Sequence, residues 1–90
     1  MISITNGIDT KELSLSDFIQ FFRRKGWSIK CVKGRGWNYI YQTGPNYSYT
    51  IEMDPSIFRY LKTNGYLEGV NHNQSDLFSI SLWNFTPKSI

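Results

Sequence analysis

The chain has 90 residues and a mass of 10.5 kDa, which suits one domain of modest size spanning residues 1–90. Hydrophobic residues make up 40% of it and charged residues 19%, a balance that argues against intrinsic disorder, and no apolar run approaches the roughly 20 residues of a membrane-spanning helix. One cysteine and one histidine exclude a disulfide framework and argue against a zinc site. We therefore expect no metal or other cofactor, no membrane, and a location in the cytoplasm of a bacterial or host cell.

The N-terminal residues 1–9 contain a short apolar alternation, Ile2 and Ile4, that ends at the turn pair Asn6-Gly7. This pattern leaves two alternatives open, an added edge strand or a loose end.

A helix is predicted next. Ser14, with Asp17 three residues later, forms a capping box at its start, and Gly26 suits the left-handed residue that ends it. Trp27, just beyond the glycine, can fold back onto Phe22. The apolar residues of this helix recur at helical spacing and form one stripe: Leu15, Phe18, Ile19 and Phe22.

Beyond this helix the apolar period changes to two, which is typical of half-buried strands. Turns at residues 33–36 and 43–46 divide the region into three strands, and we expect these to pair as an antiparallel meander. Cys31, Tyr41 and Tyr49 fall on strand positions that we expect to face the core.

A second helix is predicted to begin at Asp54, its N-cap, with Pro55 at its first position, and to end at Asn64-Gly65. A polar loop, residues 71–76, and a fourth strand, residues 77–85, follow. The expected fold is α+β: an α-β-β-β-α core with an additional C-terminal β-strand, in which two helices pack against an antiparallel sheet.

The net charge of +3 is unevenly distributed, because residues 23–35 hold six cations and no acid. Such a cluster is an electrostatic footprint for phosphate groups or for an acidic protein surface, and a plain solvated surface is the third interpretation. Trp37, at the tip of the predicted hairpin, is the aromatic side chain that we expect to be exposed for stacking. The predicted contact residues are Arg23, Arg24, Lys25, Lys30, Lys33, Arg35 and Trp37.

Three segments resemble the HicA (YcfA-like) toxin family, and together they span about residues 14–66. Residues 14–27 are similar to the opening helix of that family with its closing Gly-Trp step, residues 33–39 resemble its Gly-Ser-His hairpin and the tyrosine that follows, and residues 57–66 resemble its second helix. The resemblance implies a fold like that of a double-stranded-RNA-binding domain, and binding to RNA.

Gly36 stands where the family has the histidine that cleaves RNA as a general acid and base. The one histidine of this chain, His72, falls in the predicted polar loop and matches no family position. We therefore expect no catalytic residue, and an active ribonuclease that uses His72 is kept only as a hypothesis to test.

Two functions from different classes remain open. The first is a non-catalytic nucleic-acid-binding protein, with RNA favoured, whose contacts are the predicted basic residues. The second is a phage or mobile-element inhibitor or adaptor, similar in kind to an anti-CRISPR protein, that binds an acidic protein surface, a host defence complex or an antitoxin. The chain contains no alanine and much Asn, Ile, Ser and Tyr, a composition that fits an AT-rich coding source of this kind.

Overall fold

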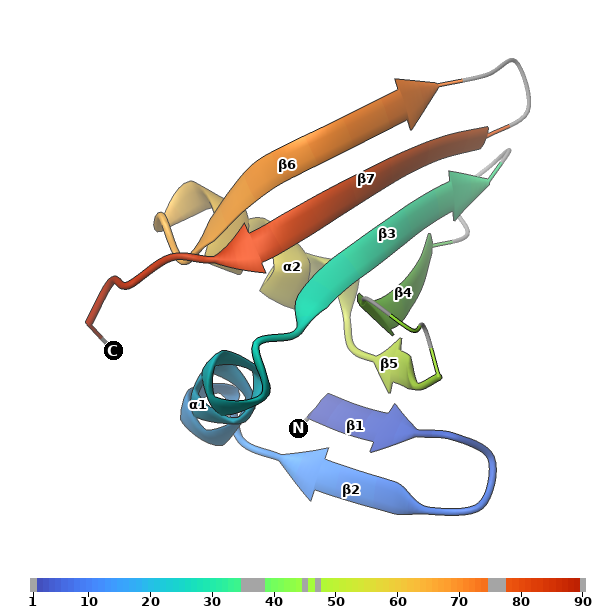
Figure 1. The fold of residues 1–90 in the computed structure, drawn as a ribbon, viewed down its shortest axis with the longest axis vertical. Coiled ribbons are helices and arrows are strands. Elements are labelled where there is room, and N and C mark those ends of the chain that lie inside the picture. Colours follow the sequence, from blue (N-terminus) through green and yellow to red (C-terminus); the bar gives the residue numbers. More distant parts are fainter. Residues whose placement is uncertain (1, 35–38, 45, 47, 75–77, 90) are drawn as a thin grey trace.

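The computed structural model describes residues 2–34, 39–44, 46, 48–74 and 78–89. In this part of the chain two helices pack on one antiparallel sheet of seven strands, which confirms the expected α+β class (Figure 1). The strands lie in the order β2-β1-β5-β4-β3-β7-β6. The elements are β1 (Ile2–Thr5), β2 (Thr10–Leu13), α1 (Leu15–Lys25), β3 (Ser28–Gly34), β4 (Tyr39–Gly44), β5 (Thr50–Glu52), α2 (Pro55–Thr63), β6 (Leu67–Gln74) and β7 (Phe78–Phe85).

The N-terminus belongs to the sheet. Strand β1 pairs with β5 on one side and with β2 on the other, so that β2 forms the edge. The turn between β1 and β2 is held by the Asn6 side chain, whose Oδ1 accepts from the N–H groups of Ile8 (2.9 Å) and Asp9 (2.7 Å). Strand β2 was not predicted, because its residues are mainly polar and exposed and show no apolar alternation.

Both helices begin and end as predicted. The Ser14 hydroxyl accepts from the Asp17 N–H (3.2 Å), and Gly26 takes the left-handed conformation (φ 67°) that ends α1. Trp27 returns to Phe22 with its N–H on the Phe22 carbonyl (3.0 Å) and its ring edge-on to the Phe22 ring. Helix α2 is capped in the same manner, by the Asp54 carboxylate at its start and by the hydrogen bond from the Tyr66 N–H to the Leu61 carbonyl (2.9 Å) beyond its end.

The three-stranded meander of β3, β4 and β5 is confirmed, and β7 adds to it on the free side of β3. The predicted polar loop was wrong in its first part, because residues 71–74 belong to β6, a strand that pairs with β7. A polar stretch can form a strand here since β6 lies at the sheet edge, where Asn71, His72 and Asn73 remain exposed. Residues 75–76 of that loop lie outside the described residues.

One row of paired residues crosses the whole sheet and defines the face that the helices cover. It runs from β2 to β6 through Lys11, Ile4, Ile51, Tyr41, Cys31, Ser81 and His72. The middle of this row is buried, with Tyr41 3% and Cys31 6% exposed, as predicted. Tyr49, by contrast, is only half-buried and packs against the core from its edge.

Aromatic side chains of both helices pack against the same face of β7. Phe18 and Phe22 of α1 pack edge-on against Phe85, with ring centroids 5.9 and 5.6 Å apart. Phe58 of α2 packs edge-on against Trp83 at 5.8 Å. Since Trp83 and Phe85 are two residues apart on one strand, their side chains point to the same face. The opposite face of the sheet carries no helix in the described structure.

Acid should weaken the cap of α2. Hydrogen bonding from the backbone N–H and side chain of Ser56 lowers the pKa of the Asp54 carboxyl, with a further contribution from the charge of Arg59. A carboxyl with a lowered pKa in the folded state stabilises the fold above its ordinary pKa of about 3.9, and that contribution is lost as the pH falls through the lowered value. We expect the melting temperature to fall more steeply below about pH 4 in the native protein than in Asp54→Asn, whose amide caps the helix without titrating. Circular dichroism melts between pH 6 and pH 2 measure this, and parallel curves for the two proteins would contradict it.

Candidate functional site

The structure disperses the predicted basic cluster. Arg23 is half-buried and donates from Nη2 to the carbonyls of Thr86 (2.5 Å) and Lys88, so it holds the C-terminal segment against α1. Arg24 and Lys25 are exposed at the end of the same helix. Arg35 and Trp37 lie outside the described residues.

Lys30 and Lys33 lie on opposite faces of β3. Ile29 and Cys31, the neighbours of Lys30 along the strand, are buried on the helix-covered face. Lys33 lies two residues after Cys31 and therefore on the same face, where it lines a cavity with Phe58 of α2. Lys30 instead lies beside Ile80 and Leu82 on the open face. Among the described members of the predicted contact set, Arg23, Arg24 and Lys25 therefore lie at the end of α1, and Lys30 and Lys33 lie on opposite faces of β3.

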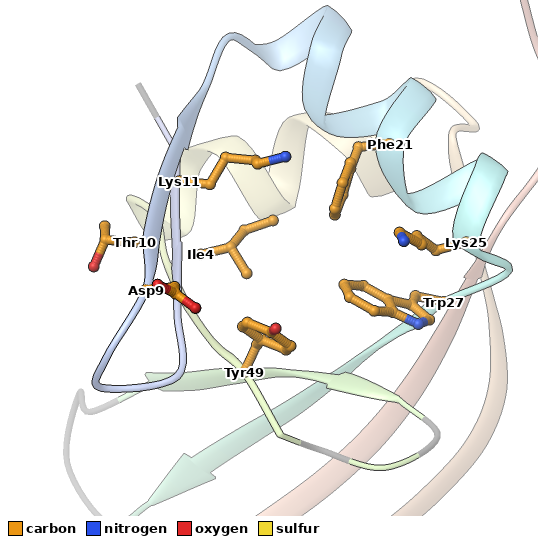
Figure 2. A pocket seen from close by; sticks show the side chains of 8 residues that line it. All are labelled: Ile4, Asp9, Thr10, Lys11, Phe21, Lys25, Trp27 and Tyr49. Carbon is orange, nitrogen blue, oxygen red and sulfur yellow. The ribbon is translucent and has the colours of Figure 1, made fainter.

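A first pocket lies between the end of α1 and the N-terminal hairpin (Figure 2), and we call it the aromatic pocket. Its volume is about 350 Å³. Three elements (β1, β2 and α1) and three loops contribute to it. The lining residues are Ile4, Asp9, Thr10, Lys11, Phe21, Lys25, Trp27 and Tyr49. The pocket exists because β2, the strand missing from the prediction, brings Lys11 opposite α1.

Three rings form the walls of the aromatic pocket. Trp27 stands edge-on to Phe21 with centroids 5.5 Å apart, and it lies 5.6 Å from Tyr49 at an interplanar angle of 30°. Two ammonium groups converge on the same space: Lys11 Nζ lies 4.7 Å from the Phe21 ring centroid, and Lys25 Nζ lies 5.7 Å from it. Figure 2 shows both lysine side chains reaching toward Phe21 from opposite sides. Flat apolar walls with two cations suit a planar group that carries, or is joined to, negative charge.

A second cavity lies under α2, on the helix-covered face of the sheet, and we call it the Tyr41 cavity. Its volume is about 280 Å³. Strands β3, β4, β6 and β7 form its floor and α2 its roof: it is lined by Cys31, Lys33, Tyr39, Tyr41, Pro55, Phe58, Arg59, Lys62, His72, Ser79, Ser81 and Trp83. His72 reaches it because β6 is a strand, and in the sheet it pairs with Ser81.

The Tyr41 cavity is rich in positive charge. Lys62 Nζ lies 4.8 Å from the Phe58 ring centroid and 5.3 Å from that of Trp83, and Lys33 Nζ lies 5.6 Å from that of Tyr39. Arg59 adds a third cation from α2, and the described lining includes no aspartate or glutamate. The sequence did not mark Lys11, Arg59 or Lys62 as site residues. Lys11 lies apart from the other cations, and Arg59 and Lys62 are spaced three residues apart on one helix, so only the fold brings these side chains to the two cavities.

The Tyr41 hydroxyl has no hydrogen-bond partner among the described residues, although its oxygen is shielded from solvent. Burial raises the pKa of Tyr41, as do the neighbouring Cys31, Tyr39 and Asp54, while the charge of Arg59 lowers it. Buried polar groups without partners are rare in native proteins and call for an explanation at each site. The phenol is therefore a neutral donor in a cavity that Lys33, Arg59 and Lys62 also line.

Nucleophilic and metal chemistry find little support at either site. Burial raises the pKa of the Cys31 thiol, and the hydrogen bond with Ser81 and the charges of Lys62 and Lys33 only partly oppose this, so Cys31 is a core residue and not an activated thiol. The Ser81 hydroxyl accepts from the Trp83 indole N–H (2.8 Å). No metal-ligating cluster occurs among the residues whose placement is described.

No protein-family model, curated protein or solved structure matches this chain in comparisons with each. The HicA resemblance therefore stays a prediction. No helix in the described ranges is long and apolar enough to cross a membrane.

The unpaired hydroxyl of Tyr41 predicts a stabilising substitution. Leaving a buried donor without a partner costs about 1–3 kcal/mol, and Tyr41→Phe removes the donor while keeping the ring 5.0 Å from Phe58. We expect the free energy of unfolding in denaturant to rise by about 1 kcal/mol in Tyr41→Phe. Tyr60→Phe is the matched control, because Tyr60 is 47% exposed and should leave stability unchanged. A destabilised Tyr41→Phe would show that the hydroxyl is already paired.

Proposed function

We propose that this protein binds single-stranded nucleic acid, with RNA favoured, at the aromatic pocket and the adjoining end of α1. The observation that carries the proposal is the convergence of Lys11 and Lys25 on the ring of Phe21, beside Trp27 and Tyr49. A base has a flat apolar face and its backbone carries a phosphate, so rings and ammonium groups in one pocket complement a nucleotide.

Each part of the pocket has a role in this proposal. An unpaired base stacks on the exposed side of the aromatic walls, and the ammonium groups of Lys11 and Lys25 neutralise the flanking phosphates. Arg24, exposed one residue before Lys25, extends the cationic track along the helix end. Asp9 at the pocket wall offers only acceptors, and it can select bases whose edge presents N–H donors.

Two further considerations favour RNA and a non-catalytic role. RNA is favoured because the resemblance of residues 14–66 to the HicA family implies binding to RNA. The residue at the family's catalytic position is Gly36, which has no side chain to transfer a proton.

Charge removal at the pocket should weaken binding in a salt-dependent manner. We expect Lys11→Gln and Lys25→Gln each to lower affinity for a short single-stranded RNA and to reduce the slope of log K against log salt by about 0.7, the value for one phosphate contact on a single strand. Fluorescence anisotropy at several salt concentrations measures both quantities, with a DNA strand of the same sequence in parallel. Lys30→Gln is the matched comparison, since it removes the same charge from the open face of the sheet. An equal loss in Lys30→Gln would favour non-specific attraction and contradict the pocket.

Stacking can be tested separately from charge. Phe21→Leu keeps an apolar side chain on α1 but removes the ring under the two ammonium groups. Because a stacked base contributes about 1–3 kcal/mol, we expect the affinity for RNA to fall about fivefold or more. The slope of log K against log salt should stay as in the native protein, because no charge is removed. The melting temperature of the variant is the control for folding. Unchanged affinity would exclude the aromatic pocket as the site of a base.

The open face of the sheet favours a second candidate function, binding of a partner protein. It presents a contiguous apolar surface with Ile40 50% and Phe78 44% exposed, together with half-buried Val32, Ile80 and Leu82. Such a surface, uncovered by any described helix, is typical of protein interaction sites. An inhibitor or adaptor of phage origin would dock through it. A stoichiometric protein recovered from nuclease-treated lysate by the native chain and by Lys25→Gln, but not by Ile40→Glu, would support this function, and recovery by all three would contradict it.

A further inference from the structure

We propose that the Tyr41 cavity is a binding site for a phosphate dianion, in which the Tyr41 hydroxyl donates a hydrogen bond to the anion and Arg59, Lys62 and Lys33 neutralise it. This site is separate from the aromatic pocket and does not rest on the proposed nucleic-acid function. The phosphate is either the free ion or the 5′-terminal monoester of an RNA, and the two sources share one recognition chemistry.

The first support is the unpaired hydroxyl. Tyr41 is 3% exposed, and its oxygen has no partner in the described structure. Of the groups that act electrostatically on this phenol, Tyr39 and Arg59 line the same cavity, and Asp54 lies outside its described lining. A hydroxyl held there has its proton to donate, and a ligand with acceptors only is its natural partner.

The second support is the distribution of charge. The three cations come from two elements on opposite sides of the cavity, with Lys33 on β3 and both Arg59 and Lys62 on α2. The ammonium groups of Lys62 and Lys33 both lower the pKa of the Cys31 thiol, so both charges act on the strand side of the cavity. The charge of Arg59 acts on Asp54, whose carboxylate lies outside the described lining and accepts from the Ser56 N–H as the cap of α2. The lining itself, as described, includes no carboxylate to compete with an anion.

The third support is size. A volume of about 280 Å³ falls just below the roughly 300–1,000 Å³ typical of sites for drug-sized ligands, and it exceeds the roughly 30 Å³ of a water molecule several-fold. A small tetrahedral anion fits this space. Arg59 supplies a planar fork that can donate two parallel hydrogen bonds to phosphate oxygens, and Ser79 and Ser81 add hydroxyls to the floor.

We expect the anion to reach the buried hydroxyl by displacing side chains of α2. Arg59 and Lys62 are both exposed, on long flexible stems, and they stand on the short helix α2 over the cavity. We expect the anion to enter between them and to draw both heads inward, which exchanges the cation–aromatic contacts of Lys62 for a contact with phosphate. The same step gives the Tyr41 hydroxyl a hydrogen-bond partner and so removes the free-energy cost of burying it unpaired.

Calorimetric titration with inorganic phosphate, at constant ionic strength set by sodium chloride, tests the proposal. We expect saturable binding to the native protein, weakened about tenfold or more in Tyr41→Phe and in Arg59→Gln, because each loses a hydrogen bond to a charged ligand. Lys30→Gln removes a charge from the opposite face of β3 and should bind phosphate as the native protein does. Melting temperatures of all four proteins confirm that each is folded.

Tyr41→Phe is the decisive variant, since it should be at least as stable as the native protein while it loses phosphate affinity. A parallel titration with one RNA in its 5′-phosphate and 5′-hydroxyl forms distinguishes the source: a difference that depends on Tyr41 assigns the site to RNA ends, and equal binding of the two forms assigns it to the free ion. Absence of saturable phosphate binding in both experiments, or binding that is equal in Tyr41→Phe and the native protein, would overturn the proposal.

Discussion

The alternation of side chains along β3 is the constraint on which the rest of the structure depends. Because successive residues of a strand point to opposite faces, Ile29, Cys31 and Lys33 face the helices while Lys30 and Val32 face outward. The buried half of this pattern continues through six strand pairings, from Lys11 at one edge to His72 at the other. The same row that builds the core under both helices therefore ends in polar groups on either side, and each end supplies a residue to a cavity.

The two cavities follow from how the helices cover that row. Helix α1 covers its β2 side and leaves the aromatic pocket, whereas α2 covers its β6 side and leaves the Tyr41 cavity. Both combine cationic side chains with aromatic rings. The open face has a different chemistry, with Ile40 and Phe78 as its most exposed apolar side chains. We therefore propose anionic ligands for the covered face and a partner protein for the open face.

Local sequence patterns predicted the helices, their caps, the meander and β7, because a helix cap, an apolar helix face or an apolar alternation involves only residues that are close in sequence. They could not predict β2 or β6, since polar edge strands form only when a neighbouring strand offers its backbone groups. Lys11 was therefore overlooked, and His72 was placed in a loop. The charge cluster at residues 23–35 is contiguous in sequence, yet strand alternation and the hydrogen bonds of Arg23 to the C-terminal segment divide it. Arg59 and Lys62 carry no local pattern that marks them as site residues, and only the packing of α2 on the sheet brings them to Lys33.

We propose that anionic ligands bind on the helix-covered face of the sheet. Amide chemical-shift mapping with a 5′-phosphorylated single-stranded RNA is the sharpest test, because each backbone amide reports its own surroundings. We expect saturating shifts at Lys11, Phe21 and Lys25 around the aromatic pocket, and at Cys31, Tyr41 and Arg59 around the Tyr41 cavity. Shifts confined to Lys30, Val32 and Ile40 on the open face would contradict it.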